Sequence, residues 1–327
     1  MKGKGDMMQK FSIVGIMLAS ALLVCIIPTW SEIVWTDYAN NPLDMPMPDG
    51  SRSYMANVIW NSDLQKYQIW YDQGSIDLVT YAESLDGITW NNAVLTSGIN
   101  LEDVLVGRGF IVYNPEWDSP YKSYFFGRND ALGDHIRFAQ SKDGITWEDN
   151  QVLDMSDATV EGQTISSPDG HAVMYNPNFT GDPYRMYVKT GAFTSIMQSS
   201  DGINWKWLDY ATLDEGFHFT AIIQISENDY RAWGFRAYDV PGIQYFRSTN
   251  GMEFEMIQDP VEVVGGGGVS GSWNDNRNYH PSVVYDGNGQ FKMWRSGRNE
   301  ASGAYRMGYA TGFDSDLYTS VITWELY

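Results

Sequence analysis

Cysteine is almost absent from this chain. The single cysteine is Cys25, which lies in an apolar amino-terminal stretch. No disulfide framework and no cluster of cysteine ligands can therefore hold the rest of the chain. The fold must rest on a hydrophobic core, which 327 residues with 15% aromatic side chains can build.

Positive charge is also scarce. The chain has 21 Lys and Arg against 41 Asp and Glu, which gives a formal net charge of −20. Such a surface repels the phosphates of nucleic acids and the headgroups of anionic lipids. We therefore expect no nucleic-acid partner and no membrane contact beyond an export signal.

The amino terminus has the pattern of such a signal. Three lysines among the first ten residues precede a largely apolar stretch over 11–27, and Thr29 and Ser31 provide a small-residue exit. We predict a signal peptide over residues 1–31, with cleavage after Ser31, and a secreted or periplasmic location for the domain formed by residues 32–327. An uncleaved anchor stays open, because an apolar stretch of roughly 17 residues is near the lower limit for spanning a bilayer.

One strand motif is repeated five times along the chain. Each copy begins with an aromatic residue and reaches Trp or Tyr three positions later. The copies are YQIWYD from Tyr67, YKSYFF from Tyr121, YRMYVK from Tyr184, YRAWGF from Tyr230 and FKMWRS from Phe291. An apolar run precedes each copy, at Val58, Ile111, Val173, Ala221 and Val283. A unit of about 50 to 60 residues, built of strands without a helical period, predicts one antiparallel sheet repeated five times.

The predicted fold class is all-β, a five-bladed β-propeller of four-stranded antiparallel blades. The predicted blades cover residues 52–96, 107–154, 162–212, 216–262 and 277–327. A ring must also close, because an open sheet edge is a liability. Residues 32–38, EIVWTDY, could supply the outer strand of the last blade. The carboxyl-terminal segment TSVITWELY, residues 319–327, competes for the same place.

A turn motif follows the first four strand motifs. Its copies are SLDGITW at Ser84, SKDGITW at Ser141, SSDGINW at Ser199 and the weaker STNGMEF at Ser248. Asp and Gly suit a tight turn, and the tryptophans can wedge between blades. Those tryptophans are Trp90, Trp147 and Trp205. We predict that these DG turns are structural, because the same device recurs at the same place in successive blades.

Together, the DG turns and the aromatic strands, in five units, resemble the five-bladed propeller superfamily of furanosidase-type glycoside hydrolases, which includes arabinanases and β-xylosidases. The resemblance covers essentially the whole mature chain. It rests on scaffold motifs, so it is more specific for fold than for activity. It implies a carbohydrate partner, an oligo- or polysaccharide, and an arabinofuranosidase- or xylosidase-like activity. The β-fructosidase branch is not indicated, because its WMNDPNG signature is absent.

The resemblance also implies three carboxyl groups at the starts of the inner strands. These are a base on blade 1, an orienting carboxylate on blade 3 and an acid on blade 4, with roughly 6.5 to 9.5 Å between acid and base in an inverting enzyme. The nearest candidates are Asp49, Asp169 and Glu215. None stands at the family's position. Met55 occupies the base position on blade 1, where it is followed by Ala56 instead of proline.

The corresponding position on blade 3 is Gly170, and on blade 4 it is His218 or Phe219. Other residues at this level could line a sugar pocket with aromatic walls. The predicted substrate-binding set is Tyr54, Arg108, His171, His218, Phe219, Tyr279 and His280. In the alternative interpretation, each His or Tyr caps an inner strand and satisfies backbone groups.

Arg52, Arg108 and Arg277 could favour an anionic sugar, although surface ion pairs explain Arg52 and Arg277 equally well. No cofactor is expected, although a metal or halide ion near His280 stays open. We expect a monomer. Two hypotheses about function remain: a hydrolase acting through Asp49, Asp169 and Glu215, and a non-catalytic propeller that binds a glycan or a protein. Met55 favours the second.

Overall fold

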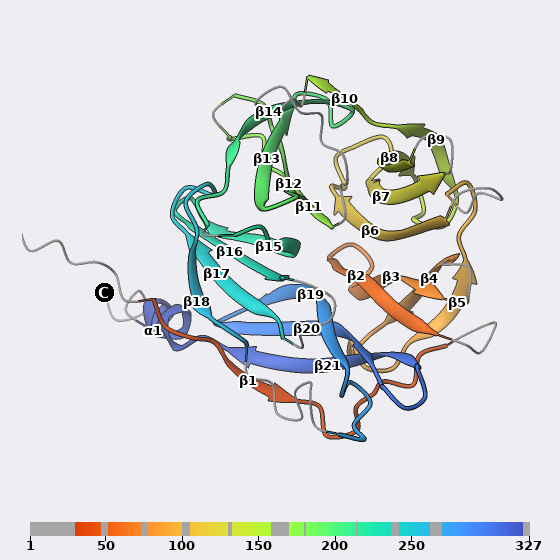
Figure 1. The fold of residues 1–327 in the computed structure, drawn as a ribbon, viewed down its shortest axis with the longest axis vertical. Coiled ribbons are helices and arrows are strands. Elements are labelled where there is room, and N and C mark those ends of the chain that lie inside the picture. Colours follow the sequence, from red (N-terminus) through yellow and green to blue (C-terminus); the bar gives the residue numbers. More distant parts are fainter. Residues whose placement is uncertain are drawn as a thin grey trace, which may run out of the picture. The chain divides into compact units, whose positions relative to one another are not determined.

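The computed structural model describes residues 30–46, 52–73, 78–99, 105–129, 133–157, 170–179, 181–213, 215–236, 242–261 and 270–322. Ser31–Tyr327 form one compact unit, and Met1–Trp30 form another. The larger unit is a five-bladed β-propeller, in which five sheets surround a central axis (Figure 1). The predicted fold class is confirmed. The predicted signal peptide lies outside the described residues except for Trp30 and Ser31.

Every blade contains four antiparallel strands, and the first strand along the chain in blades 1 to 4 lies next to the axis. Blade 1 consists of β2 (Ser53–Asn61), β3 (Lys66–Gln73), β4 (Leu78–Ser84) and β5 (Asn91–Leu95). Blade 2 consists of β6 (Leu105–Tyr113), β7 (Tyr121–Asn129), β8 (Gly133–Ser141) and β9 (Trp147–Val152). Blade 3 consists of β11 (His171–Tyr175), β12 (Tyr184–Thr190), β13 (Phe193–Ser199) and β14 (Asn204–Tyr210), with β10 (Asp154–Asp157) added in parallel to β14. Blade 4 consists of β15 (His218–Ser226), β16 (Asp229–Phe235), β17 (Gln244–Ser248) and β18 (Glu255–Gln258).

Blade 5 combines both ends of the chain. From the axis outwards, its strands are β19 (Arg277–Gly287), β20 (Gln290–Arg298), β21 (Tyr305–Phe313) and β1 (Val34–Asp37). β1 pairs antiparallel with β21, with Val34 opposite Phe313 and Asp37 opposite Ala310. The amino-terminal segment therefore closes the ring, as one of the two predictions proposed. The competing prediction, a closing strand over residues 319–327, is wrong for residues 319–322, because they belong to the helix α1 (Ser315–Ile322). Residues 323–327 lie outside the described residues.

The DG turns lock neighbouring blades together. In blades 1 and 5, the tryptophan at the fourth position of the strand motif reaches the glycine of the DG turn in the next blade: Trp70 Nε1 donates to Gly144 O over 2.7 Å, and Trp294 Nε1 donates to Gly87 O over 2.7 Å. Tyr187 in blade 3 makes the same contact, donating to a DG-turn glycine of blade 4 over 2.8 Å. The tryptophans at the ends of the first three turns, Trp90, Trp147 and Trp205, are all buried. The predicted wedge role of these tryptophans is thus confirmed.

A second set of contacts crosses all five interfaces. It comes from the residue directly after the first aromatic of each strand motif. These residues are Gln68, Lys122, Arg185, Arg231 and Lys292, and each bonds to the following blade: to Tyr121, Tyr184, Asn250, Asp314 and Tyr67, respectively. The position is the same in every blade, but the chemistry of the contact differs from one interface to the next.

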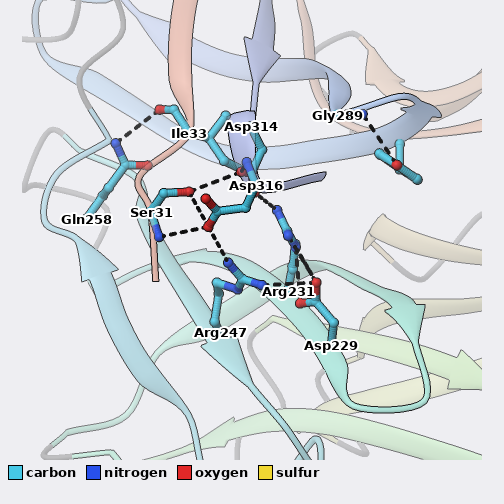
Figure 2. A network of polar contacts seen from close by, with 10 residues as sticks. Ser31, Ile33, Asp229, Arg231, Arg247, Gln258, Gly289, Asp314 and Asp316 are labelled. Carbon is cyan, nitrogen blue, oxygen red and sulfur yellow. Dashed lines mark hydrogen bonds and ion pairs between the residues drawn. The ribbon is translucent and has the colours of Figure 1, made fainter. Parts of the chain in front are cut away.

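At the interface between blades 4 and 5 this contact becomes a buried ion network (Figure 2). The guanidinium of Arg231 is fully buried and pairs with Asp314, directly before α1, and with Asp229 at 3.0 Å. The hydroxyl of Ser31 lies 2.7 Å from an oxygen of Asp316 and 3.1 Å from an oxygen of Asp314, so its one proton is shared between two carboxylates. The network therefore ties the segments on both sides of the ring closure to blade 4.

Candidate functional site

The inner strands β2, β6, β11, β15 and β19 converge on the axis (Figure 1). Their equivalent positions follow from cross-strand pairs with the repeated aromatics. The pairs are Trp60 with Tyr67, Tyr113 with Tyr121, Tyr175 with Tyr184, Gln224 with Tyr230 and Tyr285 with Phe291. In this alignment, Met55 is equivalent to Arg108, Gly170, Phe219 and His280. These five positions therefore lie at the same height along the channel axis, near the amino-terminal ends of the inner strands.

The backbone at this level is irregular in a repeated way. The ladder between the first two strands shifts between Tyr54 and Asn57 in β2 and between Tyr279 and Ser282 in β19. β6 and β15 have a shift at the same level. Within the shifts, Met55 has a φ of 51° and His280 a φ of 50°, in the left-handed region that side chains rarely adopt. Such bulges re-aim side chains and are common next to functional sites.

At the blade 1 position, where the resemblance implies a base, the chain has an apolar cluster. Met55 is 7% exposed and packs with Tyr54, Phe235 and Tyr279. Its backbone N–H donates to Ser296 Oγ over 2.7 Å. A thioether can neither accept a proton in the required way nor hold a nucleophilic water as a carboxylate does. None of the five equivalent residues at this level is acidic.

Two histidines flank the ring of Phe235. His218 stacks on it, with ring centroids 4.8 Å apart and planes at 14°, and His280 lies 6.2 Å away. Gly170 lies so close to the His218 ring that a β-carbon there would overlap Nδ1. Both histidines are buried. The result is a compact layer of imidazole and aromatic rings contributed by blades 4 and 5.

The other predicted binding residues have different surroundings. His171 is buried and its Nε2 lies 2.9 Å from Tyr124 O in blade 2, which matches the strand-capping interpretation. Phe219 is fully buried in the core between blades 3 and 4. The rings of Tyr54 and Tyr305 lie 4.9 Å apart. Arg108 belongs to β6, but its side chain lies outside the described part of the structure.

Of the three predicted catalytic carboxyl groups, only Glu215 is described; Asp49 and Asp169 lie outside the described residues. Glu215 Oε1 is 2.8 Å from Arg236 Nε, and Arg236 Nη2 is 3.1 Å from Asp259. The Glu215 side chain is 46% exposed, so its carboxylate is engaged in a surface ion pair on blade 4. The convergence of the three carboxyl groups on one cleft stays a prediction.

Sequence reasoning missed one buried carboxylate at this end of the channel. Asp72, in β3, is 2% exposed and occupies the same place in blade 1 as Phe235 in blade 4 and Ser296 in blade 5. Its carboxylate presses against Gly107 of blade 2, where no β-carbon would fit. The signal was present in the motif, since YQIWYD is the only copy with an acidic sixth residue.

Sequence reasoning also missed a cavity of about 570 Å³ in the channel. Its walls come from all five inner strands, over residues 57–60, 110–113, 173–177, 220–224 and 282–285. These are the middle and carboxyl-terminal parts of the strands, so the five strands run in the same direction. This cavity is not lined by the predicted site residues whose side chains are described, which are Glu215, Tyr54, His171, His218, Phe219, Tyr279 and His280.

Among the residues that the structure describes, no three His, Cys, Asp or Glu side chains gather as a metal site would require, and no helix is long and apolar enough to cross a membrane. An ion near His280 stays a prediction.

Comparison with solved structures identifies relatives in architecture. An N-acetylgalactosamine deacetylase from F. plautii, solved with blood group B trisaccharide, is 15% identical with a TM-score of 0.59, and the match covers 86% of this chain and 94% of that one. A glycosyl hydrolase from Bacteroides ovatus is 11% identical with a TM-score of 0.63, over 87% of this chain and 95% of that one. A thermostable family-43 glycoside hydrolase is 12% identical with a TM-score of 0.56, over 81% and 90% of the two chains.

The fold is that of the five-bladed glycoside hydrolases. At these identities the likeness concerns architecture alone. No protein-family model and no curated protein sequence matches the chain. The expected superfamily fold is therefore confirmed, whereas the choice of sugar and linkage receives no support from these comparisons.

Proposed function

We propose that this chain is a carbohydrate-binding propeller that has kept the glycoside hydrolase architecture without the proton relay of the family. The observation that carries the proposal is Met55. Its side chain is buried among Tyr54, Phe235 and Tyr279, where the family's base would stand. Recognition of hydroxyl groups needs aromatic faces and hydrogen-bonding groups, but no paired acid and base.

The proposed recognition site is the amino end of the channel, around His218, His280 and Phe235. Imidazole nitrogens can donate to or accept from sugar hydroxyls, and the partly exposed ring of Tyr305, which packs on Tyr54, offers an apolar face. The ion pair of Glu215 with Arg236 is consistent with this interpretation, because it engages the candidate acid outside the aromatic layer.

The test is a comparison of binding with turnover. Purified protein is titrated calorimetrically with neutral and uronate-containing oligosaccharides, and the same preparation is assayed on aryl arabinofuranosides and xylosides. We expect binding that His218→Ala weakens and Phe193→Ala, an exposed control on blade 3, leaves unchanged. Thermal melts of both variants establish that they are folded.

Hydrolysis remains the second candidate, since the architectural relatives include glycoside hydrolases. Turnover that Glu215→Gln abolishes without loss of fold would favour the mechanism through Asp49, Asp169 and Glu215 over the binding proposal. A chain that binds no carbohydrate and turns none over would instead favour a protein partner.

We also propose that the chain is exported and acts as a monomer outside the cytoplasm. Support comes from the signal-like pattern over residues 1–31 and from the acidic, nearly cysteine-free composition. Amino-terminal sequencing of the protein recovered from culture medium or periplasm would locate the cleavage site. Light scattering of the same material would give its mass.

A further inference from the structure

The cavity at the carboxyl end of the channel has the size of a ligand site. Its volume of about 570 Å³ falls in the range of roughly 300 to 1,000 Å³ that is usual for small-molecule pockets. It lies further along the inner strands than Met55 and the layer of His218, Phe235 and His280, because its walls begin one to three residues after the level of Met55. The proposed recognition at the amino end makes no use of it.

Aromatic side chains occupy the same register position on four of the five blades around this cavity. They are Trp60, Tyr113, Tyr175 and Tyr285, and each packs on the cross-strand aromatic of its own blade at 4.7 to 4.9 Å. All four are partly exposed, and Trp60 reaches 37%. Partly exposed aromatics that are gathered around a concave site, rather than scattered singly, are a mark of binding surfaces.

The fifth blade has a polar residue at this position. Gln224 donates through Nε2 to Tyr230 over 3.0 Å and accepts from Asn176 Nδ2 over 2.7 Å. Its amide is therefore held in one orientation at the cavity wall. The inner strands are also sheet edges, so their outward peptide groups face the axis. Among the described residues, side chains of neighbouring strands engage some of these groups, such as Val58 N, which donates to Ser282 Oγ over 2.8 Å.

In the part of the chain that the structure describes, no Asp, Glu, Lys, Arg or His lines the cavity, although the chain as a whole is strongly acidic. An ionic ligand would enter without a compensating charge, which is costly. The combination of aromatic faces, peptide donors and acceptors, and a neutral wall suits a ligand that is rich in hydroxyl groups and uncharged.

From this combination we infer that the cavity lined by Trp60, Tyr113, Tyr175, Gln224 and Tyr285 is a second binding site, for one ring of a neutral sugar at the end of an oligosaccharide. The sugar's apolar C–H face lies against one of the four aromatic rings, which form the lip of the cavity. Its hydroxyls form hydrogen bonds with Gln224 and with backbone groups of the inner strands that face the axis. The site lies at the opposite end of the inner strands from the proposed recognition site.

The full-length chain tests this inference by calorimetry and saturation-transfer NMR with neutral pentose and hexose tetrasaccharides. A tetrasaccharide of uronic acids serves as the charged probe. Trp60→Ala and Tyr285→Ala alter the cavity lip, His218→Ala alters the other end of the channel, and Phe193→Ala is the exposed control. Thermal melts accompany each variant.

We expect a neutral tetrasaccharide to bind, with Kd raised about tenfold by Trp60→Ala as a stacked ring is lost. Tyr285→Ala should weaken binding in the same direction, and Phe193→Ala should leave it unchanged, whereas His218→Ala should weaken only the separate binding event at the amino end of the channel. The uronate probe should bind there more weakly than its neutral counterpart.

Three outcomes would overturn the inference: no binding of any neutral tetrasaccharide, binding that both lip variants leave intact, or a clear preference for the uronate probe. Binding lost only in His218→Ala would support the recognition site at the amino end while removing the cavity as a second site. The two proposals can therefore fail separately.

Discussion

Single glycines at the ends of the DG turns receive the aromatic rings of the neighbouring blade. Gly144 has a φ of 76°, and a β-carbon there would lie 2.8 Å from Cζ2 of Trp70. Gly87 stands in the same relation to Trp294, also at 2.8 Å. Glycine is thus required twice at each site, once for the positive φ and once for the space that the indole fills.

Replacing Gly144 with alanine should cost more stability than the backbone strain alone. Gly191 provides the matched control, because its φ is 60° but nothing lies within 4 Å of the β-carbon position. We expect Gly191→Ala to lower the free energy of unfolding by about 1 kcal/mol and Gly144→Ala by about 2 to 4 kcal/mol, since the second also overpacks an interface. Urea unfolding of the two variants measures the difference, and equal losses would mean that the Trp70 contact is not tight.

At the scale of the element, the DG turn is a self-contained hydrogen-bonded unit. Ser84 Oγ accepts from the backbone N–H of Gly87 over 2.8 Å, and Asp86 Oδ1 accepts from Ile88 and Thr89 over 2.8 and 2.7 Å. Partial burial raises the pKa of Asp86, but the hydrogen bonds from Thr89 and Ile88 outweigh it and bring the pKa from 3.8 to about 2. The same bonds recur at Asp143 and Asp201, and the pKa of Asp201 also falls to about 2.

Stability should therefore decrease in acid as these turns take up protons. A carboxyl group with a lowered pKa in the folded chain stabilises it fully above its unfolded pKa, and this contribution is lost as the pH falls from about 4 to about 2. Asparagine keeps the acceptor without titrating, as Asn250 does in the fourth turn, where Oδ1 accepts from Met252 and Glu253 over 2.8 and 2.9 Å.

The variant carrying Asp86→Asn, Asp143→Asn and Asp201→Asn should lose less stability than the parent between pH 4 and pH 2. Asn250→Asp should lose more, because it adds a titrating turn. Thermal melting across this range compares the three proteins. Parallel melting curves for all of them would show that other groups govern acid stability.

The elements themselves could be predicted from sequence because they depend on local patterns. The repeated strand motif, the DG turns and the closing strand at residues 34–37 follow from alternation, turn chemistry and the need to cover a sheet edge. The helix α1 was not foreseen, because residues 315–322 are rich enough in β-branched and aromatic residues to resemble a strand.

From the sequence alone, only the end of the channel at which the candidate site lies could be predicted. Aligning the inner strands placed Met55, Gly170 and His280 correctly at one end of the channel. It could not give burial or direction, so Phe219 was expected at the mouth but packs between blades, and Asp72 was overlooked. Which face a side chain adopts at a bulge depends on tertiary packing, which the period of the sequence does not contain.

For the whole molecule, the ring depends on a junction between segments that are far apart in sequence. Arg231, with no exposed surface, sits between Asp229 and Asp314, and Arg247 approaches Asp229 to 3.0 Å (Figure 2). Burying charges is costly, so such a group is stabilising only while its partners remain in place.

Arg231→Met should destabilise the ring by about 3 to 5 kcal/mol, because it leaves a buried carboxylate without its main partner. Arg185 occupies the same position in blade 3 but is partly exposed; it donates to a backbone carbonyl and lies over the Phe179 ring at 4.3 Å, with no carboxylate partner within the described ranges. Arg185→Met should therefore cost less than about 1 kcal/mol. Chemical unfolding measures the free energy of unfolding of these variants. The double variant with Arg231→Met and Asp314→Leu should recover part of the stability lost in Arg231→Met. Equal losses of stability for the two arginine variants would contradict this role of the network.

The contacts between blades also specify the order of the blades. Arg231 of blade 4 meets its carboxylate at Asp314, which directly follows the last strand of blade 5, whereas Arg185 of blade 3 meets the carbonyl of Asn250 in blade 4. A second copy of blade 4 inserted after the first would offer Arg231 only the turn at Asn250, and a buried guanidinium would lose a carboxylate. Only blade 5 can follow blade 4 without that penalty. Lengthening the propeller by duplicating this blade would thus require a simultaneous change at the new junction, unlike growth in arrays whose repeats are interchangeable.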